Sequence, residues 1–435
     1  MRNAAPERPF GEFEAHKPIH RIGPGSMSEK LAVHGGEPVR EEPFPGWPVW
    51  DERELEAVTE VFESGTWGVN GTQTETFCDE YAERHDAAHA VTVTNGTIAL
   101  QIALQAAGVG PGDEVIVPPY TFVATASAVL DCNAVPVFAD IERDSVCLDP
   151  ASVEAQLTDR TAAVIPVHLG GRPADMDALK AVCEPHDVTI VEDCAQAHGS
   201  WLDGEAVGTI GDVGCFSFQS SKNLSAGEGG LVLTNDDEIY TRAWSIANVG
   251  RVPDGDWYEH PVLGSNHRMT EFQGAILRTQ LSRMDDQLAQ RERAAQRLHD
   301  GLANVDGVEP QSEHPDTTSR AYHLYIFRLD LEALGGISKG QFLEAVRAEG
   351  IPAGGGYRPL YGNELFTNIE RTAPAVCELA DTVPDYTAVS CPETDRAANE
   401  VGWMAQRVLL ASDEDIDDIA RAFAKVADAA DTLGD

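Results

Sequence analysis

Between residues 90 and 235 the chain alternates short apolar runs with segments of helical spacing, and this alternation constrains its fold more than any other feature. The strand-like runs are "AVTVTN", "EVIVP", "VPVFAD", "AAVIPVH", "VTIVED", "GCFSF" and "GLVLTN". Residues 96–108 have helical spacing and end at Gly108, the residue type that most often terminates helices. Strands that alternate with helices build parallel sheets with helices on both faces. The sequence therefore predicts an α/β fold with a doubly wound, mostly parallel sheet.

The composition around this region divides the chain into three predicted parts. Residues 1–30 are rich in proline, glycine and charge, which is typical of a flexible arm. Residues 31–300 are expected to form the large domain. One long helix is expected there after Met269, with four apolar side chains on one face: Leu277, Leu281, Met284 and Leu288. Residues 301–435 contain a strand in "YHLYIFRLDL" and helices in "SKGQFLEAVRAEG" and "DEDIDDIARAFAKVADAA", which predicts a smaller α+β domain.

The net charge argues against two classes of partner. The chain carries 72 acidic residues against 31 basic ones, a formal net charge of −41. Such a surface repels nucleic acid and anionic membranes. It fits a protein that stays soluble in very salty cytoplasm, because concentrated salt screens the self-repulsion. The scarcity of lysine also favours a halophilic source; the lysines are Lys17, Lys30, Lys180, Lys222, Lys339 and Lys425.

Cysteine spacing and hydropathy give further expectations. None of the eight cysteines forms a Cys-x-x-Cys pair, and no cysteine and histidine group has zinc spacing. We therefore expect free thiols in a reducing compartment and no metal site. No apolar run reaches membrane-spanning length, and the N-terminus lacks the apolar core of a signal peptide. These features predict a cytoplasmic protein.

Four groups of residues with chemical potential fall at or just after predicted strand ends, where open α/β sheets bind ligands. "TNGT" ends at Thr97 and opens a helix, so it can receive a phosphate. "PPYTF" ends at Phe122, whose ring can stack on a flat cofactor. Asp193 can hold a pyridinium proton, and Lys222, 29 residues later, can form an imine. Each feature alone has a plain structural explanation, but together they predict a pyridoxal phosphate (PLP) site.

The ordered series of motifs resembles the DegT/DnrJ/EryC1/StrS family of PLP-dependent sugar aminotransferases, which have the aspartate aminotransferase fold, type I. The resemblance extends from about Leu31 to the C-terminus. The motifs that carry it are "NGTIAL", "GDEVIVPPYTFVATASAV", "VHLGGRPADMDAL", "VEDCAQAHGS", "GDVGCFSFQSSKNLSAGEGG" and "SNHRMTEFQGAI". Within the family, "FSFQSSKNLSAGEGG" and "IPAGGGYRPLY" are most similar to the branch of glutamine:scyllo-inosose aminotransferases and aminohydroxybenzoate synthases.

The resemblance implies roles for individual residues around the cofactor ring. Lys222 would form the imine with PLP and later carry the proton between substrate and cofactor. Asp193 would keep the pyridine nitrogen protonated. Gln196 would hydrogen-bond the ring's 3-oxygen. Phe122 would stack on the ring face, where many relatives have tryptophan or tyrosine.

The phosphate and the second subunit are assigned in the same way. Gly96, Thr97 and the backbone of Ile98 would receive the phosphate at a helix N-terminus, and Ser217 would donate its hydroxyl to it. Asn266 matches the family position that reaches the phosphate from the neighbouring subunit. The resemblance therefore implies a homodimer with shared active sites.

Other residues have less distinct roles. His198, Arg268 and Tyr357 are candidate substrate contacts, although His198 is equally well explained as a packed histidine bonded to the backbone. His168 lies at a strand end and has either a site role or an architectural one. Glu228 either orients Lys222 or caps the turn. Three glycines near it are expected to permit close backbone approach: Gly227, Gly229 and Gly230.

The resemblance implies an aminotransferase that moves an amino group from glutamate or glutamine to a keto-sugar, such as a nucleotide-linked one, or to a ketocyclitol. One alternative is other PLP chemistry on this fold, such as dehydration or aminohydroxybenzoate synthesis. Dehydratase relatives replace the lysine with histidine, so Lys222 argues against dehydration, whereas aminohydroxybenzoate synthases keep the lysine. A second alternative is a non-catalytic PLP-binding regulatory protein. The intact set of Lys222, Asp193 and phosphate residues argues against it.

Overall fold

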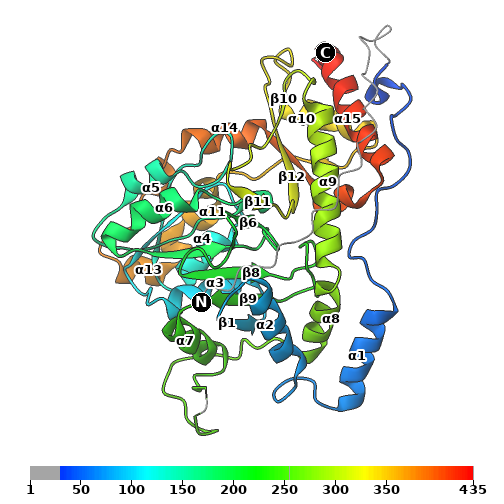
Figure 1. The fold of residues 1–435 in the computed structure, drawn as a ribbon. Helices are drawn as coiled ribbons and strands as arrows, with labels where there is room; N and C mark the ends of the chain where they lie inside the picture. The colour runs from blue at the N-terminus through cyan, green and yellow to red at the C-terminus, as the bar shows by residue number, and fades with distance from the viewer. Residues whose placement is uncertain (1–29, 254, 435) are drawn as a thin grey trace.

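The fold is built on a seven-stranded central sheet (Figure 1). The computed structural model describes residues 30–253 and 255–434. Within them the strand order is β1-β9-β8-β5-β4-β2-β3. The strands are β1 (His89–Val93), β2 (Glu114–Val117), β3 (Val135–Phe138), β4 (Thr161–Val164), β5 (Thr189–Asp193), β8 (Val213–Ser217) and β9 (Gly230–Thr234). The strands from β8 to β3 are parallel, whereas β9 is antiparallel to β1 and β8, so the predicted mostly parallel sheet is confirmed.

Alternating side chains of the strands enter separate cores on the two faces of the sheet. In β2, Val115 and Val117 pack with the helices of one face, whereas Ile116 packs on the other. The first face is covered by α3 (Gly96–Ala106), α4 (Ala124–Asp131) and α7 (Asp237–Ala247). The second is covered by α2 (Gln73–Arg84), α5 (Pro150–Gln156) and α6 (Met176–Cys183). Helices on both faces confirm the doubly wound prediction.

The residues at the two ends of helix α3 explain where it begins and where it ends. Asn95 caps the N-terminus, because its side-chain oxygen accepts a hydrogen bond of 2.9 Å from the Ile98 N–H. Gly108 follows the last turn with a φ of +96° and donates its N–H to the carbonyl of Gln105 at 3.2 Å. The predicted stop at Gly108 is therefore confirmed.

The prediction of a single long helix after Met269 is wrong, because two helices occupy this stretch. Helix α8 (Glu271–Leu281) ends before Arg283, and α9 (Met284–Leu302) begins directly after it. Figure 1 shows them end to end along one side of the molecule. Arg283 is buried at the break and pairs with Glu54 of α1 (Glu52–Ser64). A tertiary ion pair therefore accompanies a break that the apolar spacing does not reveal.

A smaller antiparallel sheet lies toward the C-terminal end of the chain. Its order is β10 (Val308–Pro310), β12 (Leu324–Leu329), β14 (Val401–Ala405) and β13 (Ala353–Gly354). Helices α9, α10 (Lys339–Ala348) and α15 (Asp413–Asp428) share its apolar cluster, and α14 (Pro392–Glu400) precedes β14. A third sheet joins β11 (Thr317–Ser319), β6 (Trp201–Leu202) and β7 (Glu205–Ala206).

Core packing crosses the predicted domain boundary at residue 300 in both directions. Leu31 and Phe44 pack in the cluster of the small sheet. Conversely, residues 360–391 pack against Val117 and Phe138 of the central sheet. That segment contains α11 (Glu364–Thr367), α12 (Ile369–Thr372) and α13 (Pro374–Leu379). The division into 31–300 and 301–435 remains a prediction about folding units.

Two other expectations concern the N-terminal arm and membrane-spanning segments. The predicted arm, residues 1–30, lies outside the described residues except for Lys30. Among the residues that are described, no helix combines the length and the apolarity needed to cross a membrane.

Candidate active site

Lys222 lies in the turn after β8, and its amine is available for reaction. The backbone N–H of Lys222 donates to the carbonyl of Gln219 at 2.8 Å, which closes the turn. Within the described part of the chain, its half-buried side chain makes no hydrogen bond or ion pair. Burial lowers the pKa of Lys222 to about 8, although the nearby carboxylate of Asp193 opposes the shift. A lowered pKa leaves more neutral, nucleophilic amine near neutral pH.

Asp193 lies at the carboxyl end of β5, on the strand next to β8. Its side chain is buried, and Oδ2 accepts a hydrogen bond of 2.8 Å from the Thr125 hydroxyl. Oδ1 accepts a hydrogen bond of 3.1 Å from the Ala195 N–H. Burial raises the pKa of Asp193, while these two bonds and the charge of Lys222 oppose that rise. The carboxylate is therefore fixed in orientation, as a partner for a protonated ring nitrogen must be.

The N-terminus of α3 is in close contact with the end of β8. A Cβ atom added to Gly96 would lie 2.6 Å from Cβ of Ser217, so only glycine fits there without a shift. A Cβ atom on Gly230 would lie 2.3 Å from the carbonyl oxygen of Asn95. The expected close backbone approach at Gly230 is thus confirmed. Helix amides, Thr97 and the Ser217 hydroxyl come together in a setting that suits a phosphate.

The backbone N–H of Ile98 has a protein partner in the structure, and its assignment to the phosphate stays a prediction. Its N–H already donates to the Asn95 side chain, which caps α3. A phosphate could use this amide only by displacing the cap. The phosphate assignment that remains consistent with the structure uses Gly96, Thr97 and Ser217.

The ring-binding candidates come from three separate segments. Phe122 is 58% exposed, in the turn before α4, and its carbonyl accepts the Thr125 N–H at 3.2 Å. Its side chain is therefore open to a ligand, and its backbone contacts the residue that holds Asp193. Gln196 is buried and uses Oε1 to accept the Gly170 N–H at 2.9 Å.

Tyr357 joins this group from the small-sheet side of the chain. Its hydroxyl accepts a hydrogen bond of 3.3 Å from Nε2 of Gln196. Burial raises the pKa of Tyr357 to about 12, so the hydroxyl stays protonated. The structure thus brings Tyr357 together with the predicted cofactor residues, although 161 positions separate it from Gln196.

His198 has internal partners at both ring nitrogens. Nε2 donates to the backbone carbonyl of Ser217 at 2.8 Å, and Nδ1 accepts from the Tyr81 hydroxyl at 2.9 Å. Burial lowers the pKa of His198 to about 3, so the ring is neutral. This geometry agrees with the packed-histidine alternative, and it leaves no ring nitrogen for a substrate.

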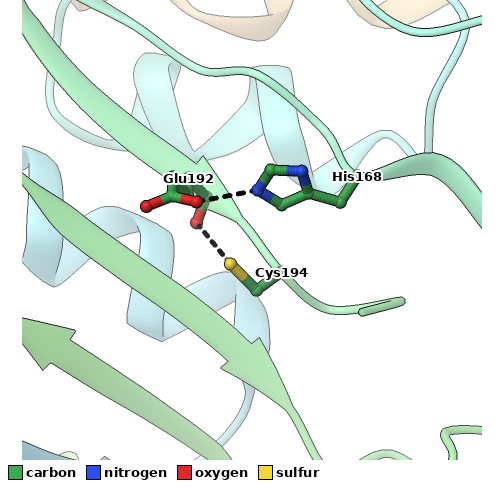
Figure 2. A group of neighbouring side chains, drawn as sticks. All are labelled: His168, Glu192 and Cys194. Atoms are coloured by element: carbon green, nitrogen blue, oxygen red, sulfur yellow. Dashed lines mark hydrogen bonds and ion pairs between the residues drawn. The ribbon is translucent and has the colours of Figure 1, made fainter. Parts of the chain in front are cut away.

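His168, Glu192 and Cys194 form a buried cluster around the end of β5, the strand that carries Asp193 (Figure 2). Nε2 of His168 lies 2.9 Å from Oε2 of Glu192, and Nδ1 accepts the Ala174 N–H at 3.0 Å. The two Glu192 oxygens also accept three backbone N–H groups, those of Gly208, Ile210 and Gly211. Since these polar atoms already have protein partners, we interpret the cluster as an architectural link behind Asp193 rather than as a metal centre.

Asn266 and Arg268 stand apart from this group within one chain. Asn266 is exposed, and it forms a backbone bridge to Asn248 and accepts a hydrogen bond of 3.4 Å from the Arg268 N–H. Nη1 of Arg268 is buried without a hydrogen-bond partner among the described residues. Burial and the charge of Arg251 lower the pKa of Arg268. An unpaired guanidinium nitrogen of this kind suits an anionic ligand.

Glu228 does not engage Lys222 in the described chain. Its side chain is exposed, and its backbone carbonyl accepts a hydrogen bond of 2.8 Å from the Gln273 side chain. Gly227 and Gly229 beside it have φ values of +85° and +149°, so they provide the turn that returns the chain to β9. The role of Glu228 in the structure is thus limited to its backbone.

Sequence reasoning missed Thr125. The Thr125 hydroxyl holds Asp193, and the only signal for it is a threonine three residues after Phe122 in the first turn of a helix. That contact is not visible in a pattern of residue types alone. Asn95, by contrast, agrees with the helix cap that "NGT" suggests, because asparagine before a helical run is a standard N-cap.

The arrangement as a whole fits PLP. A free amine, a buried and oriented carboxylate, an exposed aromatic face and a helix N-terminus beside a serine are the features that this cofactor requires. Residues 48–423 match the model of the "DegT/DnrJ/EryC1/StrS aminotransferase family". This match covers most of the chain and includes every residue of the candidate PLP site described above.

Curated relatives and solved structures agree with the family match. The chain is 40% identical over 416 residues, 94% of its length and 100% of the relative's, to a putative L-glutamine:3-amino-2,3-dideoxy-scyllo-inosose aminotransferase of Streptoalloteichus tenebrarius. It is 39% identical over 416 residues, 92% of its length and 97% of the relative's, to the L-glutamine:2-deoxy-scyllo-inosose aminotransferase of Streptomyces kanamyceticus.

Two solved structures show the same fold. The crystal structure of 3-amino-5-hydroxybenzoic acid synthase matches with a TM-score of 0.80 and 36% identity over 89% of this chain and 99% of that one. DesV of S. venezuelae matches with a TM-score of 0.76 and 32% identity over 86% and 94% of the two chains. The fold is therefore that of type I PLP enzymes. Family model, relatives and structures together establish that this chain belongs to the DegT/DnrJ/EryC1/StrS aminotransferase family and that it is a PLP-dependent aminotransferase.

Proposed function

We propose that this enzyme transfers an amino group from glutamine to a ketocyclitol of the scyllo-inosose class. The observation that carries the chemistry is the unpaired amine of Lys222 beside the oriented carboxylate of Asp193. The donor and acceptor are inferred from those of two relatives that are 39 to 40% identical to this chain, both named as L-glutamine-dependent aminotransferases of scyllo-inosose compounds. The same class of reaction also includes transfer from glutamate and transfer to a nucleotide-linked keto-sugar, which are the alternatives for the donor and the acceptor.

Each residue has one task in this proposal. PLP, when bound, supplies a carbonyl that exchanges amines and a ring that withdraws electrons from the reacting carbon. Lys222 holds the cofactor and, once released, removes and returns the proton at that carbon. Asp193 keeps the ring nitrogen protonated. Thr125 holds the Asp193 carboxylate in place through its hydroxyl.

The remaining residues bind and orient the cofactor. Gly96, Thr97 and Ser217 receive the phosphate where α3 meets β8. Phe122 covers one face of the ring with its exposed side chain. Gln196 donates an amide N–H to the 3-oxygen of the ring, and the Tyr357 hydroxyl accepts a hydrogen bond from the same amide nitrogen.

We infer further that the enzyme is a homodimer in which Asn266 and Arg268 serve the partner's site. Two observations support this inference. Nη1 of Arg268 is buried without a protein partner among the described residues. A partly exposed aromatic group also lies on α1, the loop after it and α8, where Phe62 is in ring contact with Trp67 at 5.6 Å and with Phe272 at 4.7 Å. Exposed aromatic clusters of this kind are typical of interfaces.

A direct experiment tests the chemistry and the substrates. Borohydride reduction of the purified holoenzyme should attach the cofactor to the peptide that contains Lys222, and attachment to another lysine would refute its role. The unreduced holoenzyme and a Lys222→Ala variant are the controls. Glutamine and glutamate should then be compared as donors, with ketocyclitols and nucleotide-linked keto-sugars as acceptors, in concentrated KCl. Transfer to a nucleotide-linked keto-sugar alone would overturn the ketocyclitol assignment.

Mixing two inactive variants tests the shared site. Lys222→Ala protomers and Asn266→Ala protomers should each be inactive or weak alone. In a hybrid dimer, one site would combine an intact Lys222 with an intact Asn266, so activity should reappear after subunit exchange. Absence of recovery, with hybrid dimers confirmed by mass, would show that Asn266 does not act across the interface.

A second candidate is the formation of an aminohydroxybenzoate. The observation that favours this candidate is the 36% sequence identity between this chain and the solved 3-amino-5-hydroxybenzoic acid synthase. Such a reaction would yield an aromatic product with new ultraviolet absorbance, whereas amine transfer to a ketocyclitol would not. The same acceptor screen therefore separates the two candidates.

A further inference from the structure

The side chain of Lys339 occupies a site built from three backbone carbonyls. Its Nζ donates to the carbonyl oxygens of Gly355 at 2.5 Å, Ala398 at 2.6 Å and Val401 at 2.9 Å. An ammonium group has three N–H donors, and here each has one acceptor. The planar guanidinium of arginine cannot direct three donors at carbonyls that converge on one point. This geometry explains why lysine stands at this position in a chain that otherwise prefers arginine.

The three carbonyls belong to segments that are distant in sequence. Ala398 lies in α14, Val401 begins β14, and Gly355 lies in the turn formed by residues 354–357, which we name the glycine turn. The ammonium of Lys339, at the start of α10, therefore ties the glycine turn to the α14–β14 junction. All three acceptors are backbone carbonyls, so the Lys339 side chain holds the path of the turn whatever side chains the turn itself carries.

Gly356 shows how closely the glycine turn is packed over this site. Its φ is +79°, and an added Cβ atom would lie 2.4 Å from the Tyr120 hydroxyl and 2.7 Å from the Val401 carbonyl oxygen. The same Cβ atom would lie 3.6 Å from Nζ of Lys339. The turn is thus packed against both Tyr120 and Val401, close to the ammonium of Lys339.

The glycine turn ends at Tyr357, which contacts the cofactor residues. The N–H of Tyr357 donates to the Tyr120 hydroxyl at 3.3 Å, and its ring packs on Trp403 at 4.8 Å. Its hydroxyl accepts the 3.3 Å hydrogen bond from Gln196, three residues beyond Asp193. A continuous series of contacts therefore runs from Lys339 through the glycine turn to the candidate site.

We propose that Lys339 is a positioning residue whose ammonium, held by three carbonyls, sets the glycine turn and thereby the place of Tyr357 beside the acceptor. The three N–H donors of Lys339 are used by backbone carbonyls, so none is left for a cofactor or substrate. The kinetic part of this inference rests on the proposed aminotransferase function, whereas the structural part does not. A corollary follows from the chemistry of the site: once the side chain is removed, the three carbonyls can bind a small ammonium ion that carries N–H donors.

The experiment measures hydrogen–deuterium exchange of the peptide that covers residues 353–358 in the full-length holoenzyme. Lys339→Ala should speed exchange there by about tenfold or more, because charge-assisted hydrogen bonds of about 1.5–3 kcal/mol are lost. Methylammonium chloride should restore slow exchange. Tetramethylammonium chloride, which has the same charge but no N–H donor, should not. It therefore also serves as the background salt.

Three further variants make the result specific. Lys339→Met keeps the apolar stem and covers the case in which the alanine variant fails to fold; it should speed exchange without any response to methylammonium. Lys339→Arg should behave like Lys339→Met. Lys425→Ala removes another half-buried ammonium, which pairs with Glu349 at 2.8 Å, and should leave the 353–358 peptide unchanged.

Kinetics then separate a positioning role from a general loss of stability. Lys339→Ala should raise KM for the acceptor by about tenfold, leave KM for the amino donor within about twofold, and recover with methylammonium. The proposal is overturned if exchange at 353–358 is unchanged, if Lys425→Ala changes it equally, or if tetramethylammonium rescues equally well. A wild-type enzyme that transfers no amine would refute the proposed function, while the exchange result would still stand.

Discussion

The hydroxyl of Thr125 donates a hydrogen bond of 2.8 Å to Oδ2 of Asp193. This contact joins the first turn of α4 to the end of β5 across 68 positions of sequence. It opposes the effect of burial, which raises the pKa of Asp193. The ability of Asp193 to remain ionised, and so to hold a ring proton, therefore depends partly on a threonine in a different segment.

Replacing Thr125 with valine should shift the acidic limb of the kcat/KM profile to higher pH. Loss of a hydrogen bond to the charged form raises the pKa of Asp193 further, so the carboxylate ionises only at higher pH. A bond to a charged group of about 1.5–3 kcal/mol corresponds to about one to two pH units. Thr125→Ser keeps the hydroxyl and should retain the wild-type profile. If Thr125→Val has an unchanged acidic limb, the hydrogen bond does not tune Asp193.

The rate of PLP attachment to cofactor-free enzyme should be half-maximal near pH 8. Only the neutral amine of Lys222 attacks the PLP carbonyl, and burial lowers the pKa of Lys222 to about 8. The charge of Asp193 raises this pKa, so Asp193→Asn should move the half-maximal pH downward. Stopped-flow absorbance measures both rates. A half-maximal pH near 10.5, that of an ordinary lysine, would contradict the lowered pKa.

Gly96→Ala should weaken PLP binding by about tenfold or more. The new methyl group would lie 2.6 Å from Cβ of Ser217, and such overpacking costs about 1–3 kcal/mol. Gly110→Ala is the matched control, because nothing lies within 4 Å of a Cβ atom there. Equilibrium titration with PLP and thermal unfolding give the two readouts. Equal behaviour of the two variants would show that the contact between Gly96 and Ser217 can relax at no cost.

The midpoint of thermal unfolding should rise when KCl increases from 0.1 M to 1 M. A net charge of −41 favours unfolding through self-repulsion, and added salt shortens the screening length from about 10 Å to about 3 Å. Sucrose at matched osmolality controls for effects unrelated to charge. A midpoint that is flat or falls with KCl would count against the predicted adaptation to salt.

Local sequence patterns predicted the central sheet because each strand and turn is a local unit. The run in β5 places Asp193 at a strand end, and Gly108 terminates α3, both as expected. Such features depend on propensities and periodicity within about ten residues. The break between α8 and α9 could not be predicted in this way. It accompanies the burial of Arg283 against Glu54, which is 229 positions away.

The residues of the candidate site also divide into those that the sequence indicated and those whose contacts depend on the tertiary structure. Residue types and their order indicated Lys222, Asp193 and the helix start at Gly96, because the chemistry of PLP demands an amine, a carboxylate and a phosphate cradle. The same reasoning assigned the Ile98 amide to phosphate, although it is bound by Asn95. It also left His198 open as a substrate contact, whereas both ring nitrogens face protein partners.

The sequence by itself determined the strand and helix alternation, the family and the residues whose functional groups the reaction needs. Only the tertiary structure decided which of those groups are free. Lys222 has an available amine, whereas the ammonium of Lys339 is held by three carbonyls. The physical reason is that hydrogen bonding between residues far apart in the chain depends on how the segments pack, and a residue's type records only what it is able to donate or accept.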